Sequence, residues 1–376
     1  MAARRLDLVE CFAEIVDPRI ERTKQHLLTD ILALAVLAVI AGAEGWEDIE
    51  EFGNQKHEWL RQFLRLPNGI PSHDTISRVF RMLKPAEFET AFQDWMKSLQ
   101  ETLGFQQIAI DGKTVRRSHD RRSLKSALHL VCAWSVANHL VLGQQATDVK
   151  SNEIAAIPQL LKLLDLQGAI VTIDAMGCQK RIARQIVEGG GNYVLAVKQN
   201  QPKLHAAIVE RFQQLEDTSR ADCDVRQLTT QDKAHGRQER RSYSVAPLPE
   251  SMQSFQRDWK QLTNLGRAIN ITQRDGQETR EVRYFILSGQ LGVKRFAASV
   301  RGHWGIENSL HWVLDTSFRE DESRIRKDHG PENLATIRRL AVALIKRDRS
   351  PGSIKKKRKR AAWNHHALLN IVQQAT

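Results

Sequence analysis

The order of strand and helix patterns between residues 105 and 200 constrains the fold of this chain more than any other feature. Strand patterns lie over residues 107–115, 129–137, 140–149, 169–174 and 193–197, and helical patterns lie over 152–164 and 180–188. Because the 169–174 segment is almost entirely apolar, we expect it at the centre of a sheet, buried on both faces. Three strands followed by alternating helices and strands predict an α/β fold, with a mixed sheet flanked by helices.

The remainder of the chain divides around this predicted core. We expect a helical domain over 1–100, a first part of the core over 105–200, a partly β inserted subdomain over 201–289, a helical remainder of the core over 290–348 and a basic C-terminal tail over 349–376. In the first region, Ser72 is placed to cap a helix that begins at His73. With the helix after it, this unit could read DNA through Arg78, Arg81 and Lys84. From sequence alone, an ordinary helical hairpin is the favoured alternative.

Charge and composition bound the functions that are open to this chain. Its 376 residues are 41% hydrophobic and 27% charged, which excludes collagen-like, low-complexity and wholly disordered chains. The net charge is +12, and the segment 346–360 alone holds nine basic residues and one acid. A polyanion is therefore expected to bind partly through a local patch that includes Lys355, Lys356, Lys357 and Arg358. A charge run of this kind is also typical of a solvated tail.

Neither a membrane nor an oxidising compartment is indicated. The longest uncharged apolar run, residues 31–43, is shorter than the roughly 20 residues that a membrane-spanning helix needs. The four cysteines are scattered and form no C-x-x-C pair, so neither a disulfide framework nor a zinc site is expected. No secretion signal is visible at the N-terminus. We expect a cytoplasmic protein in a reducing environment.

Two aspartates stand at or near the ends of predicted strands. Asp111 follows the apolar run 108–110, and Asp174 follows the run 170–173. A carboxylate in such a position is costly unless a cation neutralises it. Lys113 lies two residues from Asp111 on the same strand face, so a simple ion pair would account for Asp111 alone. If the two strands are neighbours, their spacing of about 4.8 Å brings both carboxylates close enough to share a cation.

A shared divalent metal would relieve the repulsion between these two carboxylates. Oxygen-only ligands favour Mg²⁺ or Mn²⁺ over zinc. Two such ions about 3.5–4 Å apart can activate an attacking oxygen and stabilise a leaving oxygen when a phosphodiester is displaced. A third carboxylate from elsewhere in the chain would complete the site.

The helical segment 301–315 supplies candidates for this third carboxylate. Glu307, His311 and Asp315 follow one another at four-residue spacing, which aligns them roughly along one helix face. A solvated polar stripe is the alternative interpretation of the same spacing.

Other residues of this region are assigned packing or surface roles. Trp304 and Trp312 are expected to pack into the sheet or to cover the site. The mixed charges of residues 318–327 are typical of an exposed face, and we do not expect them to be catalytic.

Three motifs occur in order along the chain. They are Ile110-Asp-Gly-Lys113, Thr172-Ile-Asp-Ala-Met-Gly-Cys-Gln179, and His303-Trp-x-Ile-Glu-Asn-x-Leu-His-Trp312 followed by Leu314-Asp315. The motifs resemble those of bacterial insertion-sequence DDE transposases, specifically the H-repeat-associated group. Residues 1–100 also look like the helical domain of that group, so the resemblance spans nearly the whole chain. It implies a ribonuclease-H-like core in which Asp111, Asp174 and Glu307 are catalytic and hold Mg²⁺ (or Mn²⁺), with two ions expected.

The positions around Glu307 depart from the broader cut-and-paste group. That group usually carries Tyr, Arg and Lys seven before, four before and seven after the glutamate, where this chain has Val300, His303 and Leu314. Arg301 and His303 are candidates to grip phosphate in their place. Lys113, on the first strand, is a further candidate for DNA contact. The hairpin-forming variant of the reaction therefore does not carry over from the resemblance.

The resemblance favours a transposase that binds double-stranded DNA at its element ends, hydrolyses a phosphodiester and joins the freed 3′-OH to target DNA. A homodimer on DNA and a nucleoid-associated location in the bacterial cytoplasm would accompany this activity. The alternative is a DNA-binding protein that descends from transposases and no longer cuts. A ribonuclease or repair nuclease is a weaker interpretation, because the N-terminal region and the insertion have no evident role there. Short inverted repeats around the coding DNA would favour the transposase.

Overall fold

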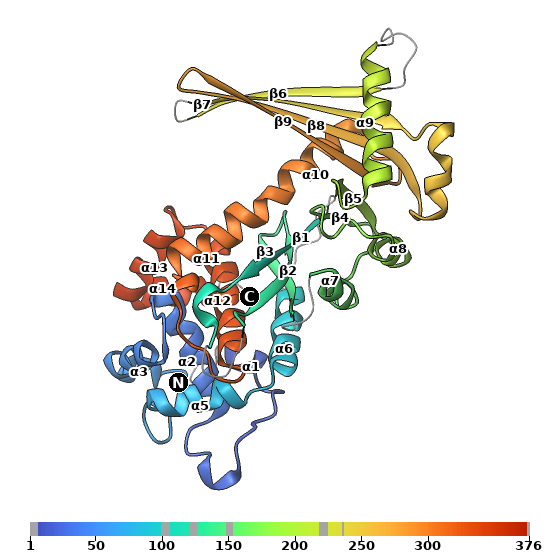
Figure 1. Ribbon diagram of the computed structural model, residues 1–376. Coiled ribbons are helices and arrows are strands. Elements are labelled where there is room, and N and C mark those ends of the chain that lie inside the picture. The colour runs from blue at the N-terminus through green and yellow to red at the C-terminus, as the bar shows by residue number, and fades with distance from the viewer. Residues whose placement is uncertain are drawn as a thin grey trace.

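A continuous sheet of nine strands runs through the protein, as the computed structural model shows (Figure 1). The structure describes residues 7–98, 106–120, 126–147, 153–217, 225–234 and 237–373. The strand order across the sheet is β3-β2-β1-β4-β5-β9-β8-β7-β6. The predicted fold class, a ribonuclease-H-like mixed sheet flanked by helices and joined to an N-terminal helical region, is confirmed.

Five strands form the core half of the sheet, and their bounds are β1 (Gln107–Thr114), β2 (His129–Ser135), β3 (Leu140–Ala146), β4 (Ile170–Ile173) and β5 (Asn192–Val197). Strands β1, β4 and β5 are parallel, whereas β2 and β3 pair antiparallel. Strand β4 lies inside the sheet between β1 and β5, and all its residues are buried as expected. Along β1, Ala109 packs into one hydrophobic core while Ile108 and Ile110 pack into another, so the core sheet is covered on both faces.

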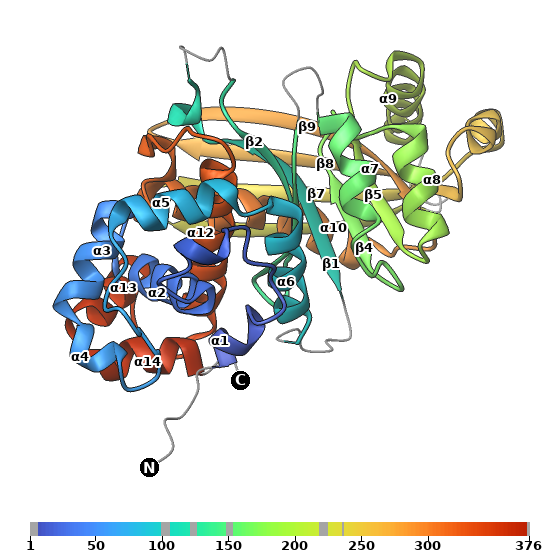
Figure 2. The ribbon, with the colours of Figure 1, turned by 90° about the horizontal axis from the view of Figure 1, so that it is seen from below.

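Helices cover the two faces of this core sheet. One face is covered by α7 (Glu153–Leu161) and α8 (Lys180–Glu188), and the other by α6 (Pro85–Ser98), α10 (Val293–Ile306) and α12 (Gly330–Arg347). Figure 2 shows these two layers from below, with α7 and α8 on one side. After α10 the chain continues through a π-helical turn, η5 (Glu307–His311), into α11 (Trp312–Ser317) and the short 3-10 turn η6 (Glu320–Glu322). Asp111 therefore projects toward the α10–α12 side, because it shares a strand face with Ala109.

The N-terminal helices share a hydrophobic core with the C-terminal helices. The N-terminal helices are α1 (Asp7–Cys11), η1 (Glu21–Thr23), α2 (Leu28–Ala41), α3 (Trp46–Gln55), α4 (His57–Leu60) and α5 (His73–Met82). The C-terminal helices are α12, α13 (Ile354–Trp363) and α14 (His365–Gln373). Helix α2 is apolar and contacts both α12 and α13. Ser72 caps α5 as predicted, because its hydroxyl accepts a hydrogen bond from the amide of Thr75 at 3.3 Å.

The segment expected as a basic C-terminal tail, residues 349–376, contains the helices α13 and α14 within its described part. Helix α13 packs on α2, and its inward face carries Ile354, Lys357, Arg358 and Ala361 toward the hydrophobic core. Lys357 and Arg358 are 9% and 7% exposed, and Arg358 Nη2 donates to the carbonyl of Val39 at 2.9 Å. Lys355 and Lys356 stay exposed on the outer face of α13. The charge run is therefore divided between the interior and the surface.

The inserted segment extends the core sheet as a long twisted arm (Figure 1). It consists of α9 (Pro202–Asp217), β6 (Arg226–Ala234), β7 (Arg237–Pro247), the 3-10 segment η4 (Glu250–Arg257), β8 (Leu262–Arg274) and β9 (Gln277–Ser288). Strand β9 pairs antiparallel with β5 and so joins the arm to the core. Asp275 and Gly276, predicted as a hairpin turn, both have positive φ (51° and 78°), as a tight two-residue hairpin requires.

Among the described residues, no single helix is both long and apolar enough to cross a membrane. The pair α2 and α3 would pass that test together by length and composition, but the two helices are bent by 93°. Most of α2 is buried inside the protein.

Candidate active site

The parallel pairing of β1 with β4 places two aspartates side by side. Ile110 of β1 pairs with Ile173 of β4, so Asp111 and Asp174 are the next residues along two hydrogen-bonded strands. Because both strands run in the same direction, both carboxylates stand at the same edge of the core sheet. The neighbouring strands that the sequence analysis assumed are therefore present.

Asp111 is held from two directions in a largely buried position. Its Oδ1 accepts a hydrogen bond from the backbone amide of Gly112 at 2.9 Å, and His311 Nδ1 lies 3.5 Å from its Oδ2. Burial raises the pKa of Asp111 to about 7, and the nearby carboxylates of Asp174, Glu307 and Glu153 add to this rise. The site therefore concentrates negative charge that a cation would neutralise.

Asp174 occupies a tight turn directly after β4. Its Oδ1 accepts hydrogen bonds from the backbone amides of Met176 (3.1 Å) and Gly177 (3.3 Å), which fix the carboxylate at the strand end. Burial raises its pKa and Glu153 adds to the rise, whereas the two amides and Lys198 oppose it. Lys198 follows β5 at the same sheet edge and is exposed.

Glu307 begins the π-helical turn between α10 and α11. It lines a cavity of about 250 Å³ together with Asp174, and Thr172, Lys198, His303 and Trp304 also contribute to the wall. A π turn widens the helix locally and commonly occurs at functional sites. Here it brings Glu307 and His311 toward Asp111, while the residues Ile306, Leu310 and Leu314 are buried in the core.

The donor set of this site fits Mg²⁺ or Mn²⁺, because three carboxylates supply oxygen ligands only. Asp111 is near enough to both Asp174 and Glu307 for their charges to raise its pKa. Within the described ranges, however, no three His, Cys, Asp or Glu side chains stand close enough together to hold one metal ion. Asp111, Asp174 and Glu307 therefore do not converge on one metal-binding point in this structure.

A histidine–glutamate pair beside Asp111 was missed by the sequence analysis. His129 Nε2 lies 2.9 Å from Glu153 Oε1, and its Nδ1 lies 2.7 Å from the hydroxyl of Thr114. A Cβ at Gly112 would stand 2.1 Å from Glu153 Oε1, so glycine is required for this close approach. Glu153 was hard to single out from the sequence, because an acid in the first turn of a helix is ordinarily explained by its favourable interaction with the helix dipole.

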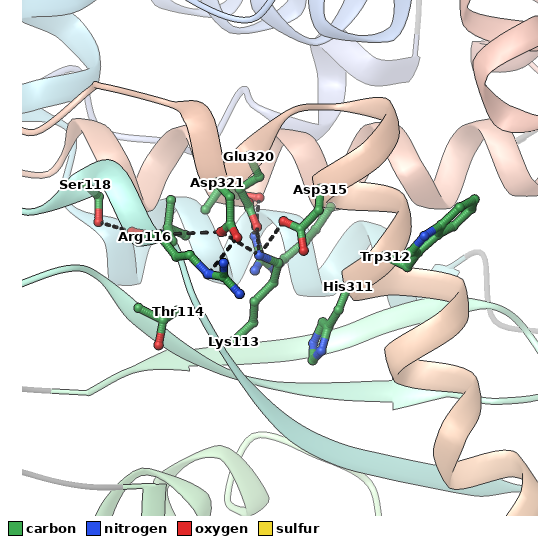
Figure 3. Close-up of polar contacts among 12 residues, drawn as sticks. Lys113, Thr114, Arg116, Ser118, His311, Trp312, Asp315, Glu320 and Asp321 are labelled. Carbon is green, nitrogen blue, oxygen red and sulfur yellow. Dashed lines mark hydrogen bonds and ion pairs between the residues drawn. The ribbon is translucent and has the colours of Figure 1, made fainter.

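Two contacts were predicted for Lys113, an ion pair with Asp111 and a contact with DNA, and its side chain is placed differently in the structure. Its side chain is 6% exposed and its Nζ lies 2.7 Å from Asp315 Oδ1 and 3.1 Å from Asp321 Oδ1, rather than against Asp111 (Figure 3). A contact with DNA is excluded by the same burial. The 318–327 run is likewise more than an exposed face, because Glu320 within it is fully buried. The physical reason is that the segment after α11 folds back over the end of β1.

The two phosphate-gripping candidates on α10 have different surroundings. Arg301 is exposed, and its Nη1 lies 2.8 Å from Asp232 Oδ2 on β6. His303 Nδ1 lies 3.1 Å from the hydroxyl of Thr172, and burial together with Arg283 lowers the pKa of His303 to about 4. A neutral imidazole at this position does not attract phosphate as a cation would, so His303 is better placed to position other groups.

The two tryptophans of this region differ in their surroundings. Trp304 is 39% exposed and lines the cavity, where the guanidinium of Arg283 stands 4.3 Å from the centre of its ring. Trp312 is 62% exposed, so it does not pack into the sheet.

The basic residues predicted to read DNA in the N-terminal region lie on or near α5. Arg78 and Lys84 are exposed, and Lys84 Nζ lies 3.0 Å from Glu87 Oε1. Arg81 is partly exposed and pairs with Asp328 at 2.7 Å, which joins α5 to the segment before α12. All three side chains are at least partly exposed at the surface.

Two protein-family models match this chain. Residues 103–344 match the family model described as "Transposase DDE domain", and residues 9–96 match the model described as "DDE_Tnp_1-associated". The chain belongs to the DDE transposase family. The part of this transposase that matches the "Transposase DDE domain" model includes Asp111, Asp174 and Glu307.

Relatives of this transposase match it over nearly its full length. The protein named "H repeat-associated putative transposase YhhI" of Escherichia coli (strain K12) is 40% identical over 97% of both chains. "Putative transposase YncI" of Escherichia coli O157:H7 is 42% identical over 95% of this chain and 92% of its own. A solved piggyBac transposase synaptic complex with hairpin DNA is similar with a TM-score of 0.44 and 9% identity, over 98% of this chain and 77% of that chain.

The charge crowding at Asp111 predicts a pH-dependent stability of the transposase. Since its pKa is raised to about 7 in the folded chain, Asp111 contributes stability at low pH that is lost as the pH rises from about 4 to 7. We expect Asp111→Asn, measured in EDTA, to raise the free energy of unfolding by about 1–3 kcal/mol at pH 8 and by much less at pH 4. Denaturant titrations of parent and variant at both pH values would check this, and an equal gain at both would contradict it.

Proposed function

We propose that this protein catalyses DNA transposition by cutting DNA at the ends of its element and joining the freed 3′-OH to target DNA. The observation that supports this proposal is the pairing of Asp111 and Asp174 on adjacent parallel strands, with Glu307 beside them at the start of the π turn. Bound there, Mg²⁺ or Mn²⁺, with two ions proposed, would activate the attacking oxygen and stabilise the leaving oxygen. Asp111, Asp174 and Glu307 would hold these ions.

Several residues of this chain would orient the DNA around that centre. Lys198 stands at the same sheet edge as Asp174 and Arg283 lines the adjoining cavity, so both can neutralise phosphates next to the scissile bond. His311 would orient the carboxylate of Asp111 through its Nδ1. These residues would contact phosphates and not base edges. Their contacts with DNA at the catalytic centre would therefore not depend on the DNA sequence.

Recognition of the element ends is proposed for the N-terminal region. Helix α5 begins at a capped turn and carries Arg78 and Arg81 at least partly exposed, and the exposed Lys84 follows it directly. Helices presented in this way can enter the major groove and read base edges. The two element ends would then each engage one copy of the protein, as a homodimer.

The proposal is tested by incubating the purified full chain with Mg²⁺ and duplex DNA taken from both sides of its coding sequence. Nicked and joined products, scored on a denaturing gel and abolished by EDTA, are the expected result. Tight and selective binding of these ends with no cleavage under any divalent metal would instead support the non-catalytic alternative.

The exposed lysines of α13 should contribute sequence-independent DNA affinity. We expect the triple variant Lys355→Gln, Lys356→Gln and Lys359→Gln to flatten the plot of log K against log salt by up to about 3, since each neutralised phosphate contributes about 0.9 to the slope. These three side chains are exposed, so the fold should be retained, whereas deleting the whole run would also remove the buried Lys357 and Arg358. An unchanged slope would remove α13 from the DNA interface.

A further inference from the structure

A buried lysine on the strand of Asp111 contacts three carboxylates from the segment that follows Glu307. Lys113 Nζ lies 2.7 Å from Asp315 Oδ1, 3.1 Å from Asp321 Oδ1 and 3.6 Å from Glu320 Oε2. Figure 3 shows the lysine pointing into this group, with His311 beside the same strand. One side chain of β1 therefore binds both α11 and η6.

Two arginines complete the group and balance its charge. Arg116 Nε lies 3.1 Å from Asp321 Oδ2, and Arg339 Nη1 on α12 lies 2.9 Å from Glu320 Oε1, with both members of the latter pair fully buried. Three cations thus face three carboxylates. Arg339 Nε also donates to the Cys132 sulfur at 3.3 Å, and Cys132 is the residue of β2 that pairs with Asp111.

The location of this ionic cluster accounts for its presence better than a contribution to folding stability does. Burying charges costs free energy that their attraction often fails to offset, so a buried ionic cluster is weak evidence of stabilisation. This cluster begins two residues after Asp111 on the same strand face and ends on the helix that follows Glu307. It therefore ties together the two elements on which two of the proposed metal-binding carboxylates stand.

We propose that Lys113 is a positioning residue, which holds the helix that follows Glu307 against the strand of Asp111, the two elements that would carry ligands of a shared divalent metal. The inference rests on the proposed function. Lys113 touches neither DNA nor metal in this role, and it acts through Asp315, Asp321 and Glu320. Asp315 stands about two helical turns after Glu307, across the π turn, so a loosened Asp315 would release Glu307 as well.

The test compares the full-length parent with Lys113→Met in Mn²⁺ binding without DNA, followed by the electron paramagnetic resonance signal of free Mn²⁺. We expect the variant to bind Mn²⁺ at least 10-fold more weakly, because supporting residues of metal sites typically contribute about 10–100-fold to affinity. DNA binding in EDTA should stay within about twofold of the parent. Arg267→Met is the matched control, since Arg267 is a buried cation paired with Glu216 at 2.7 Å on the distant arm, and it should leave Mn²⁺ affinity unchanged.

Two further variants keep the test decisive if Lys113→Met fails to fold. Lys113→Met with Asp315→Asn removes one charge of each sign and should fold, yet should bind Mn²⁺ as weakly as the single variant. Lys113→Arg keeps the charge and should recover part of the affinity. Parental Mn²⁺ affinity in a folded variant without the lysine charge would overturn the positioning role alone. A parent that binds no Mn²⁺ would overturn the proposed function and this inference together.

Discussion

Replacing Asp174 with asparagine should abolish both strand cleavage and strand transfer while leaving DNA binding intact. The change keeps the size of the side chain and an oxygen that can accept from the amides of Met176 and Gly177. It removes the negative charge that would hold the metal, and one site serves water and the 3′-OH as successive nucleophiles. Since even outer residues of metal sites contribute about 10–100-fold, we expect a loss of at least about 100-fold.

Asp174→Asn should leave folding stability and DNA affinity unchanged or slightly increased. Asparagine at 174 relieves repulsion with Asp111, whose pKa is raised partly by Asp174, so the folded protein should be as stable as the parent or slightly more stable. The site also loses an anion that would face the DNA backbone. Gel-shift titrations in EDTA and thermal unfolding would measure these two quantities.

The matched control is Asp165→Asn, which changes an exposed aspartate at the opposite end of β4. Its cleavage and joining products on a denaturing gel should equal those of the parent. Cleavage by Asp174→Asn at the parental rate would refute the assignment of the two aspartates. A parent that binds the ends and never cuts would make the non-catalytic alternative the better account.

The core of the fold was predictable because its signals are local. The apolar runs before Asp111 and Asp174 indicate buried strands, and a buried strand that follows a helix joins its neighbours in parallel. The adjacency of the two strands was only a condition of the sequence analysis, and the pairing of β1 with β4 in the structure is what places the two aspartates side by side. Glu307 is different, because its place on a helix was predictable whereas its association with the site came from the resemblance.

The partners of the buried charges could not be predicted, because they depend on packing between distant segments. Lys113 has an acid two residues away in sequence, yet its partners are Asp315 and Asp321, which are brought over β1 only when α11 and η6 fold back. Similarly, a run of basic residues gives no sign of which side chains will face inward. Lys357 and Arg358 are buried because they lie on the face of α13 that packs toward α2.

The fully buried pair Arg339 and Glu320 predicts a large effect on stability. Burial acts to raise the pKa of Glu320, but the positive charges of Arg339 and Lys113 outweigh it and hold the pKa below its usual value. Glu320 is therefore ionised in a fully buried position. Arg339→Met would leave this charge with Lys113 at 3.6 Å as its nearest cation among the described residues.

We expect Arg339→Met to lower the free energy of unfolding by about 3–5 kcal/mol, as removal of one partner from a buried ion pair generally does. Guanidinium unfolding followed by tryptophan fluorescence would measure this loss. Arg319→Met is the control, since Arg319 pairs with Glu322 and Glu44 at the exposed surface, where a pair contributes less than about 1 kcal/mol. Adding Glu320→Gln to Arg339→Met removes the stranded charge and should recover most of the loss. A cost for Arg339→Met no greater than that of Arg319→Met would show that Glu320 does not carry a buried charge, and the charge-balanced cluster around Lys113 would lose its basis.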